Sequence, residues 1–158
     1  MHDNMKLIKT FYTSFQKLDS RGMVKCYHED IEFSDPVFPA LKGNAAKAMW
    51  KMLCLRATEL EITFGNISAN DAAGTAHWEA KYKFITTGRQ VHNKIDAEFE
   101  FQDGKIIRHR DSFDFWRWSK MAFGPIGWML GATPFFRKKV QKRVAVSLEN
   151  FMKNANIR

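Results

Sequence analysis

The sequence predicts an α+β fold in which three helices come first, a strongly curved antiparallel sheet follows, and an additional helix ends the chain. Up to about residue 55 the apolar residues recur at the spacing of helices, and from residue 59 they alternate with polar residues, as in strands. Short turns separate the alternating segments, at residues 70–74, 88–89 and 103–104. Strands joined by short turns are typical of antiparallel sheets, and helices grouped ahead of the strands are typical of the α+β class.

The N-terminal third is predicted to hold the three helices and one brief strand. Residues 3–18 place apolar side chains on one helical stripe, and residues 19–27 continue as a short second helix. A brief strand over residues 31–35 stops at Pro36, because proline cannot donate to a sheet ladder. Gly43-Asn44 then starts the third helix.

The last strand of the sheet carries the main functional signal. It follows Asp103-Gly104, a dipeptide suited to tight hairpins because both central positions tolerate positive φ. Alternate side chains of a strand face opposite sides, and the mostly apolar side comprises Ile107, His109, Asp111, Phe113 and Phe115. An imidazole and a carboxylate that face a core need hydrogen-bond partners, or a functional role that accounts for their burial. Two interpretations stay open: a satisfied polar pair in the core, or a pocket that holds an acid–base group.

Length and composition indicate one domain with a substantial core. The chain has 158 residues, of which 45% are hydrophobic. Cys26 and Cys54 fall in predicted helices without metal-type spacing, so both are expected to be reduced thiols. The N-terminus lacks the pattern of a secretion signal, and no run reaches the roughly 18 apolar residues of a membrane span. We therefore expect a cytoplasmic protein.

The net charge of +8 is concentrated near the C-terminus. Residues 137–158 hold seven basic residues against one acidic residue, Glu149. A basic helix is usually a solvated face, so this charge does not predict a nucleic-acid partner.

The segment before that helix is unusually apolar for one so rich in helix breakers. Residues 116–136 contain Gly124-Pro125, Gly127, Gly131 and Pro134 among large apolar side chains. We expect an apolar loop that covers a pocket mouth or a partner subunit, with a membrane surface as the less expected alternative. The helix over 137–154 is expected to dock through Val140, Val144 and Leu148. The chain is thus predicted to divide into a pocket domain, 1–118, and a segment, 119–158, that packs on that domain or on a partner subunit in a homodimer.

The layout from Met5 to Phe115 resembles the nuclear transport factor 2-like superfamily. Its members form a cone with a pocket between the concave face of the sheet and the helices. They include ketosteroid isomerases, limonene-type epoxide hydrolases, polyketide cyclases and binding modules without chemistry. No metal is expected, because His2, His28 and His92 show no ligand spacing, and no cofactor is expected either. The expected partner is a small apolar molecule. The expected ligand-binding residues are Tyr12, Phe15, Phe33, Trp50, Trp78, Phe99 and Phe113.

Asp35-Pro36-Val37 is similar to the segment that holds the general base of ketosteroid isomerases. The position of their oxyanion-binding tyrosine corresponds to Phe11, with Tyr12 next to it. Their second donor corresponds to Asp96 by counting, but alternation along the strand points Asp96 away from the core. Because an oxyanion hole is the largest catalytic term of such enzymes, the sequence disfavours steroid isomerisation.

The last strand, with His109-Arg110-Asp111, is similar to that of limonene epoxide hydrolases, in which an aspartate activates water; Asp111 falls on that aspartate. The Arg-x-Asp pair of those enzymes corresponds to His77-Trp78-Glu79, displaced by one residue, and their water-positioning Tyr and Asn correspond to Phe33 and Asp35.

Three classes of function remain open from the sequence. The first is a pocket for a small apolar ligand such as a terpene, sterol, polyketide or fatty acid, and we favour it with catalytic activity undecided. The second is a hydrolase or isomerase that uses Asp111 as general base, with His109 and Asp35 as further candidate catalytic residues. The third is a non-catalytic protein-interaction domain.

Overall fold

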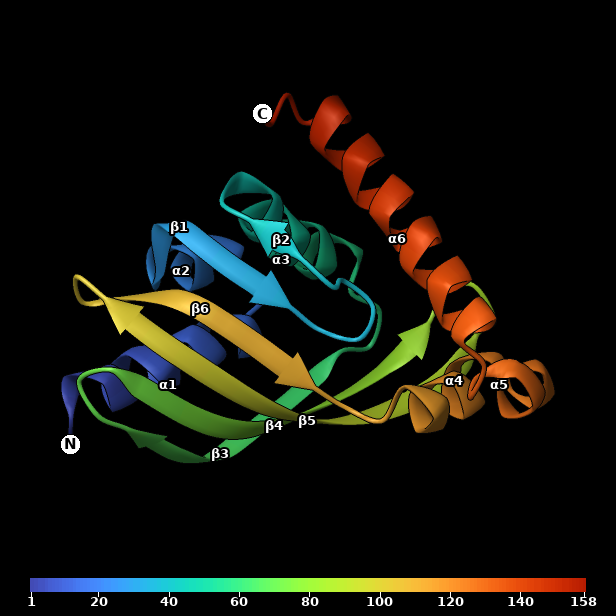
Figure 1. Cartoon of the computed structure of the whole chain (residues 1–158), viewed down its shortest axis with the longest axis horizontal. Coiled ribbons are helices and arrows are strands. Elements are labelled where there is room, and N and C mark those ends of the chain that lie inside the picture. The colour runs from blue at the N-terminus through green and yellow to red at the C-terminus, as the bar shows by residue number, and fades with distance from the viewer.

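The computed structural model describes all 158 residues and combines one curved sheet with six helices (Figure 1). The helices are α1 (Asp3–Gln16), α2 (Ser20–Lys25), α3 (Asn44–Arg56), α4 (Phe115–Phe123), α5 (Pro125–Leu130) and α6 (Pro134–Asn154). The strands are β1 (Tyr27–Ser34), β2 (Leu41–Lys42), β3 (Glu61–Ala69), β4 (Ala73–Phe84), β5 (Arg89–Gln102) and β6 (Lys105–Ser112). The α+β class predicted from the sequence is confirmed.

The sheet is mixed, with the strand order β2-β1-β6-β5-β4-β3. Strands β3 to β6 pair antiparallel in succession, as predicted. Strand β1 pairs parallel to β6, with Phe33 opposite His109, so the prediction of a purely antiparallel sheet was incomplete. The long stretch of chain between β1 and β6 supplies the crossover that a parallel pair needs.

Strand β6 differs from the predicted alternation at its start. Ile106 is fully buried and Ile107 only half-buried, whereas the prediction placed Ile107 on the core face. The register between β5 and β6 shifts between Glu100 and Phe101, which opposes Ile106. Such an irregularity moves side chains to the other face, so the predicted alternation holds only from His109 onward.

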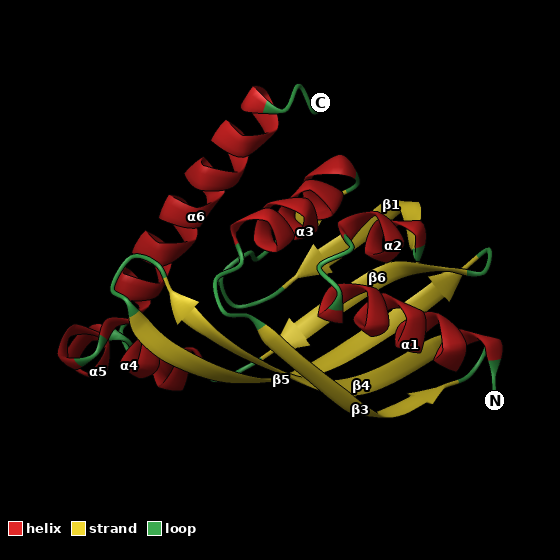
Figure 2. Cartoon of the chain, turned by 180° about the vertical axis from the view of Figure 1, so that it is seen from behind, coloured by secondary structure: helices red, strands yellow, loops and turns green.

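Helices α1 to α3 pack against the inner face of the sheet (Figure 2). Helix α1 buries Ile8, Phe11, Tyr12 and Phe15, at the spacing that predicted it. These side chains join Trp50 of α3 and the inner residues of the strands in one core cluster. Burying each large apolar side chain contributes about 1.5–3 kcal/mol to stability, so this aromatic core holds the helices on the sheet.

The segment expected to be an apolar loop instead forms α4 and α5. All but one of its helix breakers fall at helix boundaries: Gly124 has φ of 65° between the two helices, and Pro125 is the first residue of α5. The exception, Gly127, lies inside α5. A Cβ at Gly127 would lie 1.9 Å from the carbonyl oxygen of Ser119, so glycine is what lets α4 and α5 approach this closely. Thr133 accepts a hydrogen bond from Phe136 N–H and caps α6 ahead of Pro134.

Helix α6 packs within the same chain. Val144 and Leu148 join the main core, and α6 runs beside α3 (Figure 2). Phe136 and Val140 join a second cluster, which also contains Val91, Phe115, Trp118 and Ala122. The apolar stripe of α6 therefore packs against its own chain and gives no support for a partner subunit. The expected homodimer stays a prediction.

Candidate functional site

His109 and Asp111 lie on the inner face of β6, where both are buried. His109 Nδ1 lies 2.7 Å from the hydroxyl of Tyr27, and its Nε2 lies 2.8 Å from Asp111 Oδ1. Burial, with the charge of Asp111 adding to it, raises the pKa of Tyr27 well above its usual value. Tyr27 therefore keeps its proton and can donate it to Nδ1, which leaves Nε2–H to donate to the carboxylate.

Two indoles extend this pair into a network. Trp50 Nε1 donates to the Tyr27 hydroxyl at 2.8 Å, and Trp78 Nε1 donates to Asp111 Oδ1 at 3.3 Å. Both hydrogen bonds to Asp111 use the Oδ1 atom, so Oδ2 is free to accept another donor. The network thus runs from α3 to β4 across the inner face of the sheet, with one unused acceptor.

Aromatic rings surround His109. Its ring centroid lies 4.5 Å from that of Phe99 and 5.1 Å from that of Phe33, and Trp50 stacks on it at 6.0 Å. Six of the seven predicted pocket residues, namely Tyr12, Phe15, Phe33, Trp50, Trp78 and Phe99, are buried together in this cluster. The seventh, Phe113, is half-buried between the two clusters. The rings contact one another, so a bound ligand would have to displace some of them.

The hydroxyl of Tyr12 is buried and has no hydrogen-bond partner. Its ring stacks on Phe64 at 5.5 Å and lies 5.8 Å from Trp78. Burial raises the pKa of Tyr12 well above its usual value, and the nearby charge of Asp111 raises it further. An unpaired buried hydroxyl costs about 1–3 kcal/mol. Tyr12 therefore presents a proton donor, close to Asp111, that no protein atom accepts.

Asp35 follows Ser34, the last residue of β1, and begins a tight turn. Its Oδ1 accepts hydrogen bonds from Val37 N–H at 2.7 Å and Phe38 N–H at 2.6 Å. Burial raises the pKa of Asp35 to about 7; the Phe38 hydrogen bond opposes this, and the charge of Asp111 adds to it. Arg137 of α6 also lies near enough to favour the ionised form. Asp35 thus titrates near neutral pH, in the electrostatic field of Asp111.

Three polar residues of this region were not among the predicted site residues. Tyr82 accepts a hydrogen bond from Trp118 Nε1 at 2.8 Å, and Asn93 is buried on the inner face of β5 without a side-chain hydrogen bond. The alternation of β4 and β5 already placed Tyr82 and Asn93 on the inner face, so that signal was present. Tyr27 has no such signal, because the sequence predicts a helix over residues 19–27.

A separate polar cluster lies on the outer face of the sheet. His77 lies 2.8 Å from Asp96 and 2.9 Å from Glu79, which is also 2.6 Å from His92. Asp96 is thus outside the cone, as alternation predicted, while Trp78 and Ala80 face inward. No group of three or more His, Cys, Asp or Glu side chains could hold a metal ion.

Comparison with known proteins identifies the fold family. Residues 8–109 match the model of the SnoaL-like domain. The chain belongs to the SnoaL-like family. The SnoaL-like domain is part of the nuclear transport factor 2-like superfamily, so the superfamily indicated by the sequence is confirmed. No protein of curated function matches the chain significantly.

Solved structures agree with the SnoaL-like assignment. An epoxide hydrolase of the LEH-like type from M. tuberculosis is 17% identical, with a TM-score of 0.64 over 81% of this chain and 96% of that one. TerC, crystallised with polyporic acid, is 15% identical, with a TM-score of 0.67 over 77% and 99%. An NTF2-like protein of unknown function from Burkholderia pseudomallei is 15% identical, with a TM-score of 0.63 over 72% and 92%. At these identities the similarity establishes the fold alone.

Proposed function

We propose that this SnoaL-like protein binds a small, mainly apolar molecule inside the cone, with a polar group of that molecule at Tyr12 and Asp111. The observation that carries the proposal is the buried Tyr12 hydroxyl without a partner. Asp111 Oδ2 supplies a free acceptor in the same neighbourhood. A ligand hydroxyl or carbonyl would use these groups, and the surrounding rings would contact its hydrocarbon part.

The test is native mass spectrometry of the full chain purified without additives, together with melting temperatures measured in the presence of terpenes, sterols and fatty acids. We expect a bound mass or a ligand-dependent rise in melting temperature, and its loss in Tyr12→Phe and Asp111→Asn. Asp96→Asn is the matched control, because Asp96 lies on the outer face. Absence of both bound mass and stabilisation, or equal loss in the control, would contradict the proposal.

A second candidate is acid–base chemistry on the bound molecule, and the pKa of Asp35 favours it. With a pKa of about 7, Asp35 is present in both protonated and ionised forms at neutral pH. In epoxide hydrolysis, Asp111 Oδ2 would take a proton from water while the water oxygen attacks an epoxide carbon. The carbon–oxygen bond of the ring then breaks, and protonated Asp35 supplies the proton to the leaving oxygen.

This candidate is tested with a limonene-type epoxide and detection of the diol. Asp111→Asn should abolish diol formation, and Asp35→Asn should lower it. Diol formation that survives Asp111→Asn would exclude Asp111 as the base. Ligand binding without any diol would exclude the hydrolase candidate for this epoxide and leave ligand binding as the proposed function.

A further inference from the structure

We propose that helices α4 and α5 and the start of α6 bind an anionic lipid surface. Such a contact requires neither the ligand nor the chemistry proposed above. It concerns the end of the molecule opposite the N-terminus, where α4 and α5 form a lobe beyond the sheet (Figure 1). Of the alternatives left open by the sequence for this segment, the lipid surface was the least expected.

The lobe exposes a set of large apolar side chains, which we call the lobe patch. A segment that covered a pocket mouth within its own chain would bury these side chains, but Ile126 (60% exposed), Trp128 (63%) and Phe135 (74%) are exposed in the single chain. The complete lobe patch is Trp116, Ile126, Trp128, Met129, Leu130 and Phe135.

The packing of α5 explains why these side chains face outward. Gly127 and Gly131 are the buried residues of this turn, and both lie against Ser119 of α4. A six-residue helix that buries its glycine side must turn its large side chains to solvent. The large side chains of α5 are therefore exposed because its glycine side packs closely against α4. The segment that carries them is a helix and not an irregular loop.

The members of the lobe patch are neighbours in space. Trp116 Nε1 donates to the carbonyl oxygen of Trp128 at 3.0 Å, which joins α4 to α5. Leu130 accepts from the Thr133 hydroxyl, and Thr133 caps the helix that begins with Pro134-Phe135. The lobe patch thus belongs to three adjoining helices joined by these hydrogen bonds, whereas single exposed residues scattered over a surface would need no explanation.

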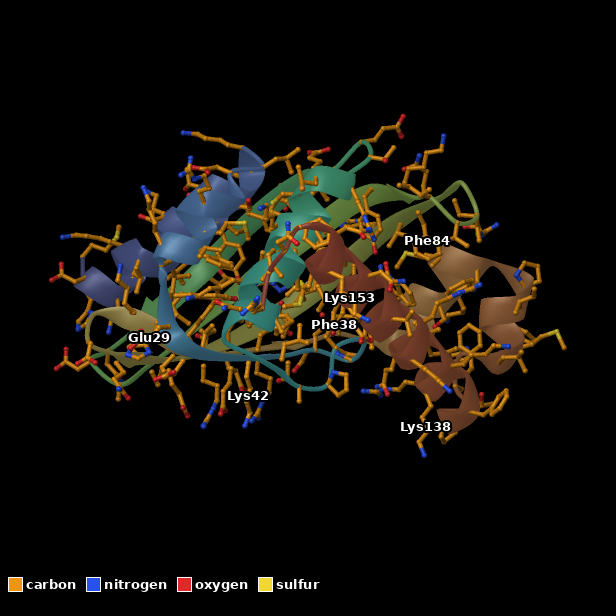
Figure 3. The ribbon with its side chains drawn as sticks, turned by 90° about the horizontal axis from the view of Figure 1, so that it is seen from above. Glu29, Phe38, Lys42, Phe84, Lys138 and Lys153 are labelled. Carbon is orange, nitrogen blue, oxygen red and sulfur yellow. The ribbon has the colours of Figure 1, made fainter.

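Basic residues are concentrated around the lobe patch, and the acidic residue nearest to it in the sequence is Asp114, the N-cap of α4. Residues 115–148 contain no Asp or Glu and seven basic residues, whereas the rest of the chain has 18 basic against 17 acidic residues. The ammonium of Lys120 lies 4.1 Å from the centre of the Trp116 ring. Lys138 points away from the body at the same end of α6 (Figure 3). The seven are Arg117, Lys120, Arg137, Lys138, Lys139, Lys142 and Arg143.

Charge decides between a lipid surface and a second copy of this chain. In a two-fold dimer the same surface of each copy meets the other, so the predominantly basic surroundings of the two lobe patches would face each other and repel. An anionic lipid surface attracts these basic residues, while the indoles and aliphatic side chains enter the interfacial region. Tryptophan is also the residue most suited to that region. None of the six helices combines the length and the hydrophobicity that a membrane span requires.

The test is flotation of the full chain with vesicles of phosphatidylcholine, with and without phosphatidylglycerol. We expect flotation only with the anionic vesicles and release by high salt. Trp128→Ser with Phe135→Ser should reduce the partition coefficient at least tenfold, and Lys138→Glu with Lys139→Glu should do the same. All four side chains are exposed, so the variants should keep the wild-type circular dichroism spectrum.

The matched control is Leu55→Ser with Lys51→Glu, which removes one exposed apolar side chain and one exposed cation of α3. The control should float like the wild type. No flotation with anionic vesicles, or equal loss in the control, would overturn the proposal. A dimer in solution that Trp128→Ser dissociates, without vesicle binding, would assign the lobe patch to a second copy and also overturn it.

Discussion

His109 and Asp111, two residues apart on β6, are joined by a hydrogen bond of 2.8 Å between Nε2 and Oδ1. Through Tyr27 and Trp50 on one side and Trp78 on the other, this pair links β1, α3 and β4 across the inner face of the sheet. His109 and Asp111, the polar pair that the sequence placed in the core, are therefore hydrogen-bonded, while Asp111 Oδ2 and the Tyr12 hydroxyl stay without a partner. A satisfied pair and a candidate ligand site thus coexist.

Asp111→Ala should destabilise the protein by about 3 kcal/mol, because it removes the acceptor of two buried donors and leaves His109 and Trp78 unpaired. Urea unfolding at neutral pH measures the change. Asp96→Ala removes a mostly exposed carboxyl from the outer face and should cost much less. Equal costs for the two variants would contradict the buried network.

Tyr12→Phe should stabilise the ligand-free protein by about 1 kcal/mol, because it removes a buried hydroxyl that has no partner. Tyr27→Phe is the matched comparison and should destabilise by a similar or larger amount, since Trp50 and His109 would lose their shared partner. Thermal unfolding of both variants decides the sign. Destabilisation by Tyr12→Phe would mean that the hydroxyl is already bonded within the protein.

Asp35 predicts a pH dependence of stability. Its pKa rises from 3.8 in the unfolded chain to about 7 in the folded protein. The folded state therefore holds its proton more tightly, and the stability linked to this group is present below about pH 4 and lost as the pH rises to about 7. Chemical unfolding at pH 5 and pH 8 should show a larger loss of stability for the wild type than for Asp35→Asn. Identical losses would remove Asp35 as the source.

Gly127→Ala should disrupt the contact between α4 and α5, because the added Cβ would lie 1.9 Å from the carbonyl oxygen of Ser119. The expected cost is roughly 3 kcal/mol, the upper range for overpacking. Gly65→Ala is the control, since nothing lies within 4 Å of its added Cβ. A wild-type melting temperature for Gly127→Ala would show that the two helices are not packed this closely.

The spacing of apolar residues along the chain predicted which side chains of a strand or helix face the core. Strand alternation placed His109, Asp111 and Trp78 inside and Asp96 outside, because each strand face is solvated or buried as a whole. The parallel pairing of β1 with β6 has no local signature, and the helix predicted over residues 19–27 hid the position of Tyr27 beside His109. The unpaired state of the Tyr12 hydroxyl likewise depends on which atoms surround it.

The C-terminal segment shows a different limit. Gly124, Pro125 and Gly131 favour a loop when only the sequence is considered, but they mark the ends of two short helices. The expectation that apolar side chains are buried also fails for Trp128 and Phe135, because the buried side of α5 is made of glycine. Composition does not reveal which side of a short helix packs inward.

The most direct test of ligand binding in the cone is a crystal structure of the full chain purified without additives. We predict density for a non-protein molecule with a polar atom within hydrogen-bond distance of the Tyr12 hydroxyl and Asp111 Oδ2, and its hydrocarbon part against the surrounding rings. A packed interior in which the Tyr12 hydroxyl bonds to a protein atom or to a single ordered water, with no further density, would contradict the account.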